Sequence, residues 1–368
     1  MKLILVFLQI ALLLPSLSFS TQTNYTSIFS FGDSYTDTGN LVTLYGGLAT
    51  TTPNVWIAKP PYGMTFFGHP NGRASDGRLA IDFIAEALGL PLLPPYLAAN
   101  QSFRRGANFA VGGATALERA FFVDKGFKAI IPFNVSLSVQ LGWFDTLKPS
   151  LCSSPQECKE YFAEALFVVG ALGWNDYVVM LLAGKSVDEA ASHVREIIGK
   201  ICAATEKLIG EGAKTVVVSG IAPLRCAAGN LVLMANQTGG ELEPDTGCNK
   251  DLNRLSKYHN AQLRRAVARL AGGAGVRITY ADFYSPIIDF VVSPEFDGGL
   301  RACCGGGGGR YNFDLAALCG MTGVRACTDP SAYVNWDGVH LTEAANRRIA
   351  DGWLSGRYAY PPIRRTAD

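Results

Sequence analysis

Apolar runs that are typical of buried strands alternate along this chain with segments that carry the apolar stripe of an amphipathic helix. The expected strands are Ser27–Phe31, Ala165–Val169, Lys214–Ser219 and Val276–Ala281, and the expected helices are Leu79–Leu88, Val187–Ile209, Lys250–Leu270 and Glu343–Leu354. Strands separated by helices are joined by right-handed crossovers, which makes them parallel and covers both faces of their sheet. The alternation therefore predicts an α/β fold, a three-layer α/β/α sandwich around a central parallel sheet.

The first twenty residues differ from the rest of the chain. Lys2 precedes the apolar run Leu3–Leu14, and Pro15 and the small residues near Ser20 follow it, which is the pattern of a cleaved secretory signal. The run is shorter than the roughly 20 residues that cross a bilayer, so no stable membrane insertion is expected. We expect a signal peptide at residues 1–20 and one domain over residues 21–368, because α/β folds often build a single domain from well over 200 residues.

Two further features indicate the secretory pathway. Four acceptor sequons for N-glycosylation occur, at Asn24, Asn100, Asn134 and Asn236. The expected location is extracellular or the cell wall, with the Golgi or the vacuole as alternatives.

The charges are nearly balanced, 32 Lys and Arg against 31 Asp and Glu, so the chain offers no general attraction for nucleic acid.

The nine cysteines are the second feature. Cys202 lies within an apolar-periodic helical segment and is expected to be the unpaired, buried thiol. Cys152 is expected to pair with Cys158, and Cys226 with Cys248. The adjacent Cys303 and Cys304 should pair with Cys319 and Cys327, in an order that the sequence leaves open. No C-x-x-C pair or neighbouring histidine suggests a metal site.

One of the four histidines stands out as a general base. His340 follows Asp337 by three residues, a spacing that lets the carboxylate accept the Nδ1 proton and leaves Nε2 free. A chance Asp and His neighbour in a loop is the alternative. His193 and His259 lie in helical segments, where a surface or packing role is expected, and His69 lies in a turn.

Ser34 is the candidate nucleophile. It follows the first expected strand and so should emerge at the carboxyl edge of the sheet, where open α/β sheets place their sites. Helix capping is the alternative role. Two later segments could donate hydrogen bonds to an oxyanion: Asn108–Ala114, whose glycines permit close backbone approach, and Gly173–Asp176, where Asn175 offers a side-chain amide.

Ser34, Gly113, Asn175 and His340, in this order and in these contexts, resemble the four blocks of the plant GDSL esterase/lipase family, part of the SGNH hydrolases with their flavodoxin-like sandwich. The resemblance implies that Ser34 attacks an ester carbonyl, that His340 transfers its proton and that Asp337 holds the imidazole. It also implies an oxyanion hole formed by the backbone N–H groups of Ser34 and Gly113 and the side chain of Asn175. No metal or organic cofactor is implied.

Three positions depart from the usual family pattern: Tyr35, Trp174 and Leu341. Tyr35 and Leu341 resemble the branch that contains acetyl esterases and esterases of specialised metabolites. The expected function is a secreted serine carboxylesterase that acts on short acyl esters, such as acetyl esters, of cell-wall polysaccharide or plant metabolites. The alternatives are an acyltransferase that uses the same acyl-enzyme, a lipase for longer acyl chains, and a noncatalytic glycan-binding or partner-binding protein with this fold.

Overall fold

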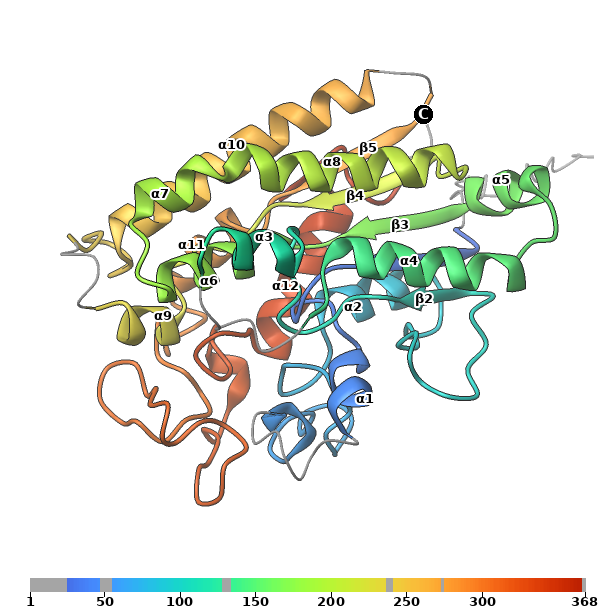
Figure 1. Ribbon diagram of the computed structural model, residues 1–368. Coiled ribbons are helices and arrows are strands. Elements are labelled where there is room, and N and C mark those ends of the chain that lie inside the picture. The colour runs from blue at the N-terminus through green and yellow to red at the C-terminus, as the bar shows by residue number, and fades with distance from the viewer. Residues whose placement is uncertain (1–24, 47–54, 128–133, 236–240, 273–274, 366–368) are drawn as a thin grey trace, which may run out of the picture.

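A six-stranded sheet forms the centre of the molecule (Figure 1). The computed structural model describes residues 25–46, 55–127, 134–235, 241–272 and 275–365; the expected signal peptide and the sequons Asn24 and Asn236 lie outside these ranges. The sheet has the order β2-β1-β3-β4-β5-β6. Its strands are β1 (Ser27–Phe31), β2 (Gly106–Asn108), β3 (Ala165–Val169), β4 (Thr215–Ser219), β5 (Arg277–Ala281) and β6 (Ala359–Tyr360).

The first five strands are parallel, as predicted, and β6 is antiparallel to β5 at the edge. In the parallel register Ile28 of β1 lies opposite Gly106 of β2 on one side and Leu166 of β3 on the other. Every residue of β1, β3 and β4 is buried, because helices cover both faces of the sheet. β2 and β6 were not predicted.

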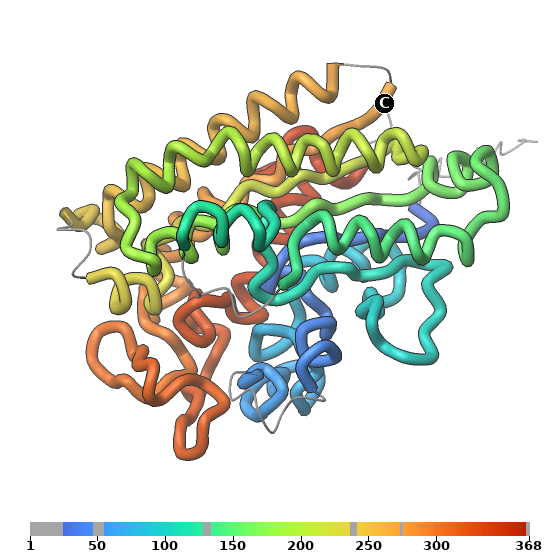
Figure 2. Tube along the Cα trace, in the orientation of Figure 1, coloured from blue at the N-terminus to red at the C-terminus, as the bar shows by residue number. Residues whose placement is uncertain are grey.

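Helices form the two outer layers (Figures 1 and 2). On one face α8 (Val194–Gly210) packs on β3, α4 (Leu137–Leu147) and α10 (Lys250–Ala271). On the other face α12 (Glu343–Ser355) packs on α2 (Ala80–Ala87) and α11 (Ser285–Val291). The predicted three-layer sandwich is confirmed.

Shorter elements connect these layers. They are α1 (Asn40–Gly46), η1 (Trp56–Ala58), α3 (Arg119–Asp124), η2 (Lys148–Ser150), α5 (Pro155–Ala163), α6 (Trp174–Leu182), α7 (Val187–Ser192), α9 (Ala228–Leu233) and η3 (Pro330–Ala332). The predicted helix Val187–Ile209 is in fact two helices, α7 and α8, which meet at His193. The helix breaks because its two parts pack on different partners: α7 also contacts α6, whereas α8 contacts α4 and β3.

Aromatic side chains fill the core between β1, β3 and the helices that cover them. Phe29 of β1 stacks on Phe167 of β3 with 5.4 Å between ring centroids, and Phe144 of α4 and Phe162 of α5 meet Phe29 edge to face. All four rings are fully buried. Large buried rings with this geometry stabilise a core beyond their buried area alone, so this cluster fixes β1 and the turn that follows it.

Four disulfides are present. The predicted bonds Cys152–Cys158 and Cys226–Cys248 are confirmed, and the order left open in the sequence is Cys303–Cys327 and Cys304–Cys319. Cys202 is the free thiol, as predicted. It is half-buried, not buried as expected, because it lies at the margin of the buried face of α8.

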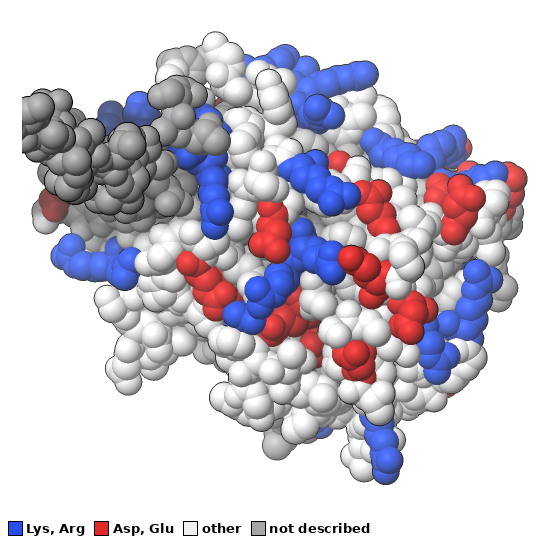
Figure 3. All heavy atoms as spheres, turned by 180° about the vertical axis from the view of Figure 1, so that it is seen from behind, with Lys and Arg blue, Asp and Glu red and all other residues white. Residues whose placement is uncertain are grey.

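Basic and acidic side chains are interspersed on the face opposite to that of Figure 1 (Figure 3). The exposed pair Arg348 and Glu295, with 2.6 Å between Nη1 and Oε2, is one example of such neighbours on the surface. The mixture agrees with the nearly balanced charge of the sequence. Among the described residues, no helix is both long enough and apolar enough to span a bilayer.

A buried ion pair predicts a large effect on stability. Arg73 binds Asp82 of α2 through Nε and Nη2, at 2.7 and 2.8 Å, and both side chains are at most 7% exposed. We expect Arg73→Met to lower the free energy of unfolding by about 3–5 kcal/mol, because it leaves Asp82 buried without its partner. Lys185→Met, which removes an exposed pair between Lys185, just before α7, and Glu189, should cost under about 1 kcal/mol. Urea unfolding of both variants measures the difference, and equal losses would contradict the prediction.

Candidate active site

Ser34 lies in the turn that follows β1, at the carboxyl edge of the parallel sheet. Gln140 of α4 fixes the start of this turn, since its side chain accepts from the N–H of Gly32 at 2.9 Å and donates to the carbonyl of Gly32 at 2.8 Å. Gln140 is fully buried. The turn is therefore held from the helix layer, and the half-buried hydroxyl of Ser34 faces the cavity at this edge.

His340 and Asp337 lie in the turn before α12, and His340 contacts Ser34 in the lining of the cavity. The distance from His340 Nε2 to Ser34 Oγ is 2.8 Å, and the distance from His340 Nδ1 to Asp337 Oδ2 is 2.7 Å. The other oxygen of Asp337 accepts the backbone N–H groups of Val339 and His340 at 2.9 and 2.8 Å. Serine, histidine and aspartate thus form one chain of hydrogen bonds.

The charges of this pair shift both pKa values. Burial by itself raises the pKa of Asp337, but the charge of His340 and the hydrogen bonds that the carboxylate accepts lower it to about 2. Burial by itself lowers the pKa of His340, but the charge and hydrogen bond of Asp337 raise it above its ordinary value. The aspartate is therefore ionised at neutral pH, and the imidazole is a stronger base than a free histidine.

Gly113 and Asn175, the two later residues predicted to donate hydrogen bonds to an oxyanion, line the same cavity as Ser34 and His340. Gly113 has φ +81°, a left-handed conformation that favours glycine. Asn175 lies in the first turn of α6, where its Nδ2 donates to the carbonyl of Ala114 at 2.9 Å. The structure thus places Ser34, Gly113, Asn175, Asp337 and His340 around one space of about 380 Å³.

Two buried aspartates, which were not predicted as site residues from the sequence, hold the loop that carries Gly113. Asp37 accepts the N–H of Gly112 at 2.8 Å in addition to three N–H groups of its own turn. Asp176 accepts the N–H groups of Ala116 and Leu117, each at 2.9 Å. Burial raises the pKa of each aspartate to about 6, although these hydrogen bonds lower it. An aspartate in a turn is common, so no sequence signal pointed to partners some 60 or more residues away.

Apolar side chains form most of the remaining lining of this cavity. They are Leu41, Trp56, Ile57, Ala74, Leu233, Phe313, Leu315, Leu318 and Val339. One wall comes from η1 and the other from the segment that Cys304–Cys319 closes; these are the blue and orange loops at the lower side of Figure 1. A Cβ at Gly338 would lie 2.5 Å from the ring of Phe313, so this wall packs directly on the turn that holds His340.

The other three histidines lie elsewhere. His259 is fully buried on α10 beside the hydroxyl of Tyr177, at 2.8 Å, and burial lowers its pKa to about 3. His193 lies between α7 and α8 next to Glu196, and His69 contacts the carbonyl of Phe67 in its own turn. These positions agree with the packing, helix-surface and turn roles expected for them.

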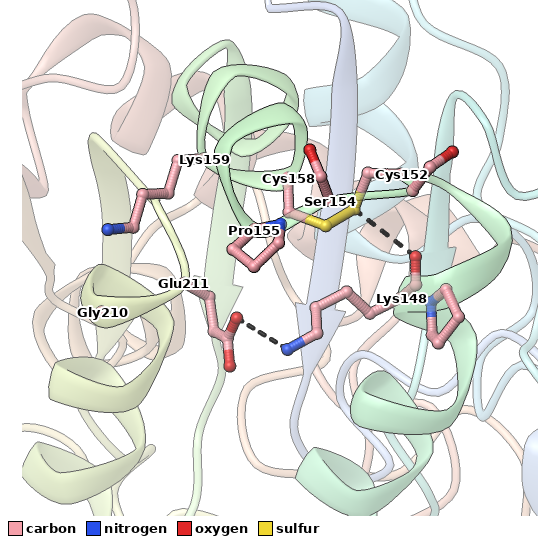
Figure 4. A pocket seen from close by; sticks show the side chains of 10 residues that line it. Lys148, Cys152, Ser154, Pro155, Cys158, Lys159, Gly210 and Glu211 are labelled. Atoms are coloured by element: carbon pink, nitrogen blue, oxygen red, sulfur yellow. Dashed lines mark hydrogen bonds and ion pairs between the residues drawn. A yellow bond between two sulfur atoms is a disulfide. The ribbon is translucent and has the colours of Figure 1, made fainter.

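A second cavity of about 380 Å³ lies beside α5, η2 and the end of α8 (Figure 4). Its lining includes the Cys152–Cys158 disulfide and Lys148, whose Nζ binds Glu211 at 2.8 Å. Its lining residues include no histidine, and its one carboxylate, Glu211, is paired with Lys148 rather than with a serine. Among the described residues, no group of three His, Cys, Asp or Glu side chains is placed to hold a metal ion.

The family model for GDSL-like lipases and acylhydrolases matches residues 28–353. The chain belongs to this family. Among similar proteins, GDSL esterase/lipase At5g45910 of Arabidopsis thaliana is 48% identical over 347 residues, which cover 92% of each chain. GDSL esterase/lipase At1g31550 of the same plant is 46% identical over 346 residues, 92% of this chain and 86% of the relative. The resemblance seen in the sequence is confirmed, and this member of the GDSL family is a carboxylic ester hydrolase.

The raised pKa of His340 predicts how the reactivity of Ser34 depends on pH. Only the neutral imidazole accepts the serine proton, so phosphorylation of Ser34 by diisopropyl fluorophosphate should fall as the pH drops through the pKa of His340. The midpoint should lie above about 6.5, the ordinary value for histidine. Mass spectrometry of the labelled peptide measures the rate, and Ser34→Ala provides the unlabelled control. A midpoint below about 6.5 would contradict the prediction, because it would mean that burial lowers the pKa of His340 by more than Asp337 raises it.

Proposed function

We propose that this GDSL hydrolase cleaves esters through an acyl-enzyme on Ser34, with His340 as general base and acid and Asp337 as the group that orients it. The observation that carries the proposal is the hydrogen bond of 2.8 Å between Ser34 Oγ and His340 Nε2. A weak nucleophile such as a serine hydroxyl needs an adjacent base within this distance.

In the first half of the reaction Ser34 Oγ attacks the ester carbonyl carbon as its proton passes to His340 Nε2. The C–O bond to the alcohol then breaks, and the leaving oxygen takes that proton from His340. The positive imidazolium formed between these steps is stabilised by Asp337, whose pKa of about 2 keeps it negative. The acyl group remains on Ser34.

In the second half water replaces the alcohol. His340 takes a proton from water, the resulting hydroxide attacks the acyl carbon, and the bond to Ser34 Oγ breaks as the serine recovers its proton. In both halves the negative carbonyl oxygen is met by the backbone N–H groups of Ser34 and Gly113 and by the amide of Asn175. Gly112 and Ala116, on either side of Gly113 in the chain, are held by Asp37 and Asp176, so these donors are fixed before the substrate arrives.

The cavity lining supports a substrate with an apolar group. Resemblance alone favours acetyl esters of cell-wall polysaccharide or plant metabolites. An acetyl group would leave much of a space of about 380 Å³ unfilled, and a glycan needs polar side chains for its hydroxyls. Here the hydroxyl of Tyr62 already binds Asp337, and the proposed role of Asn175 directs its amide to the oxyanion, so neither group is left for a sugar hydroxyl. We therefore place small esters with an apolar acyl or alcohol group ahead of acetylated polysaccharide.

The same acyl-enzyme could be used by an acyltransferase if an acceptor alcohol replaced water. Product analysis with and without added alcohol separates the two activities, and a hydrolase releases free acid in both cases.

Secretion is also part of the proposal, with cleavage after residue 20 and a single mature domain over residues 21–368. It is supported by four disulfides and by the exposure of the sequon residues Asn100 and Asn134.

Ser34 and Asn175 give the direct test of this mechanism. With p-nitrophenyl butyrate, Ser34→Ala should abolish turnover above background, and Asn175→Ala should lower kcat about 10²–10³-fold because one oxyanion donor is lost. Gln156→Ala, which removes an exposed amide on α5, is the matched control and should leave kcat unchanged. Equal turnover by wild type and Ser34→Ala would end the proposal and favour a noncatalytic binding protein.

Leu315 tests the substrate preference. Along a series of p-nitrophenyl esters from acetate to octanoate, kcat/KM should rise about threefold to fourfold for each added CH₂ that the apolar walls bury. Leu315→Asp should reduce this gain and leave acetate turnover in place. Leu242→Asp is the control, because Leu242 is also exposed but lies outside the cavity lining. A preference for acetate in the wild type would restore the polysaccharide acetyl ester as the better substrate.

A further inference from the structure

Tyr62 binds the same carboxylate oxygen that orients His340. Its hydroxyl donates to Asp337 Oδ2 at 2.8 Å, and that oxygen also faces His340 Nδ1 at 2.7 Å. Tyr62 is 4% exposed, lies between η1 and α2 in the chain, and packs edge to face on Trp336 with 5.9 Å between centroids. We propose that Tyr62 is a positioning residue of the reaction, which holds Asp337 in place and tunes the basicity of His340.

The hydrogen bonds of Asp337 show what Tyr62 adds. The carboxylate accepts four: two backbone N–H groups of its own turn at Oδ1, and His340 and Tyr62 at Oδ2. Three of these donors belong to residues 339 and 340, and Tyr62 comes from a segment 275 positions earlier. With its acceptor sites occupied, the carboxylate cannot turn away from His340 without losing a bond. Tyr62 thus ties the base to the wall of the cavity.

Tyr62 also moderates the charge of Asp337. A donor to a carboxylate stabilises the anion and so weakens its attraction for a proton on the neighbouring imidazole. Burial and the negative charge of Asp337 raise the pKa of Tyr62 well above its ordinary value, so the phenol keeps its proton across the working range. Loss of the hydroxyl should leave Asp337 a stronger partner for protonated His340 and raise the pKa of the base.

Asp33 and Tyr35 also face His340, so their effect on its pKa has to be the same in the wild type and in a Tyr62 variant. Asp33 adds its charge to that of Asp337, and burial raises the pKa of Asp33 to about 7. The ring of Tyr35 meets the imidazole edge-on at 5.8 Å, and its hydroxyl donates to the carbonyl of Val339 at 2.8 Å. Neither Asp33 nor Tyr35 changes in a Tyr62 variant. A difference in pH profile between the variant and wild type therefore reports on the hydroxyl of Tyr62.

The test is the pH profile of kcat/KM for Tyr62→Phe with p-nitrophenyl butyrate. We expect kcat/KM at its plateau to fall about 10-fold, because a hydrogen bond to a charged group is lost. We also expect the acid limb to move upward, on the order of 0.5 pH unit. Replacement of Tyr62 by 3-fluorotyrosine, whose hydroxyl is a stronger donor, should move the limb downward and preserves packing if Tyr62→Phe fails to fold. An acid limb that stays in place in the fluorotyrosine protein would overturn the proposal.

Tyr358→Phe is the matched control. In this variant too a tyrosine hydroxyl that donates to an aspartate is removed, but the bond, to Asp289 at 2.6 Å, is exposed and lies outside the cavity. It should change neither the plateau nor the acid limb. The inference about Tyr62 rests on the proposed function, and different results would contradict the two. Full activity of Ser34→Ala would remove the acyl-enzyme, whereas inactive Ser34→Ala with an unshifted Tyr62 series would remove only the role of Tyr62.

Discussion

The hydrogen bond between Ser34 and His340 joins side chains that are 306 positions apart in the sequence. It forms because β1 lies inside the sheet and α12 packs on α2, so that both turns reach the same edge. Further bonds fix the turn that holds His340: the hydroxyl of Ser75 donates to the carbonyl of Leu341 at 3.0 Å, and that of Tyr35 donates to the carbonyl of Val339. A shift of α12 against the sheet would separate the nucleophile from its base.

Buried carboxylates organise the rest of the cavity, at a cost that their hydrogen bonds offset. Asp33, Asp37 and Asp176 are fully buried, and burial raises their pKa values to about 7, 6 and 6. Each lies within three residues of a proposed catalytic group in the chain, and together they bind the backbone of the turn after β1 and of the loop that carries Gly113. Ionised groups inside a protein are costly unless they are hydrogen-bonded. Here they hold the proposed oxyanion donors in place before substrate binds, which is the arrangement that oxyanion stabilisation requires.

Much of the fold could be predicted because four strands, β1, β3, β4 and β5, are almost wholly buried and are therefore rich in apolar residues. β2 has three residues and β6 two, too few for any periodicity, and the break between α7 and α8 depends on packing partners. Ser34, Gly113, Asn175 and His340 could be predicted as site residues because each lies in a distinctive block and the blocks follow a fixed order. Tyr62 was missed because a single tyrosine after two prolines carries no pattern. Its role depends on a contact with Asp337 that only the folded chain makes.

In the proposed reaction Ser34 carries the acyl group during turnover. Rapid-quench mass spectrometry tests it most directly: the enzyme is mixed with excess p-nitrophenyl hexanoate, stopped within the first turnover and digested. We expect a hexanoyl group on the peptide that contains Ser34, formed together with a burst of p-nitrophenol and absent from the other serine peptides. Ester turnover with the acyl group on another residue, or with no acylated peptide at any quench time, would contradict it.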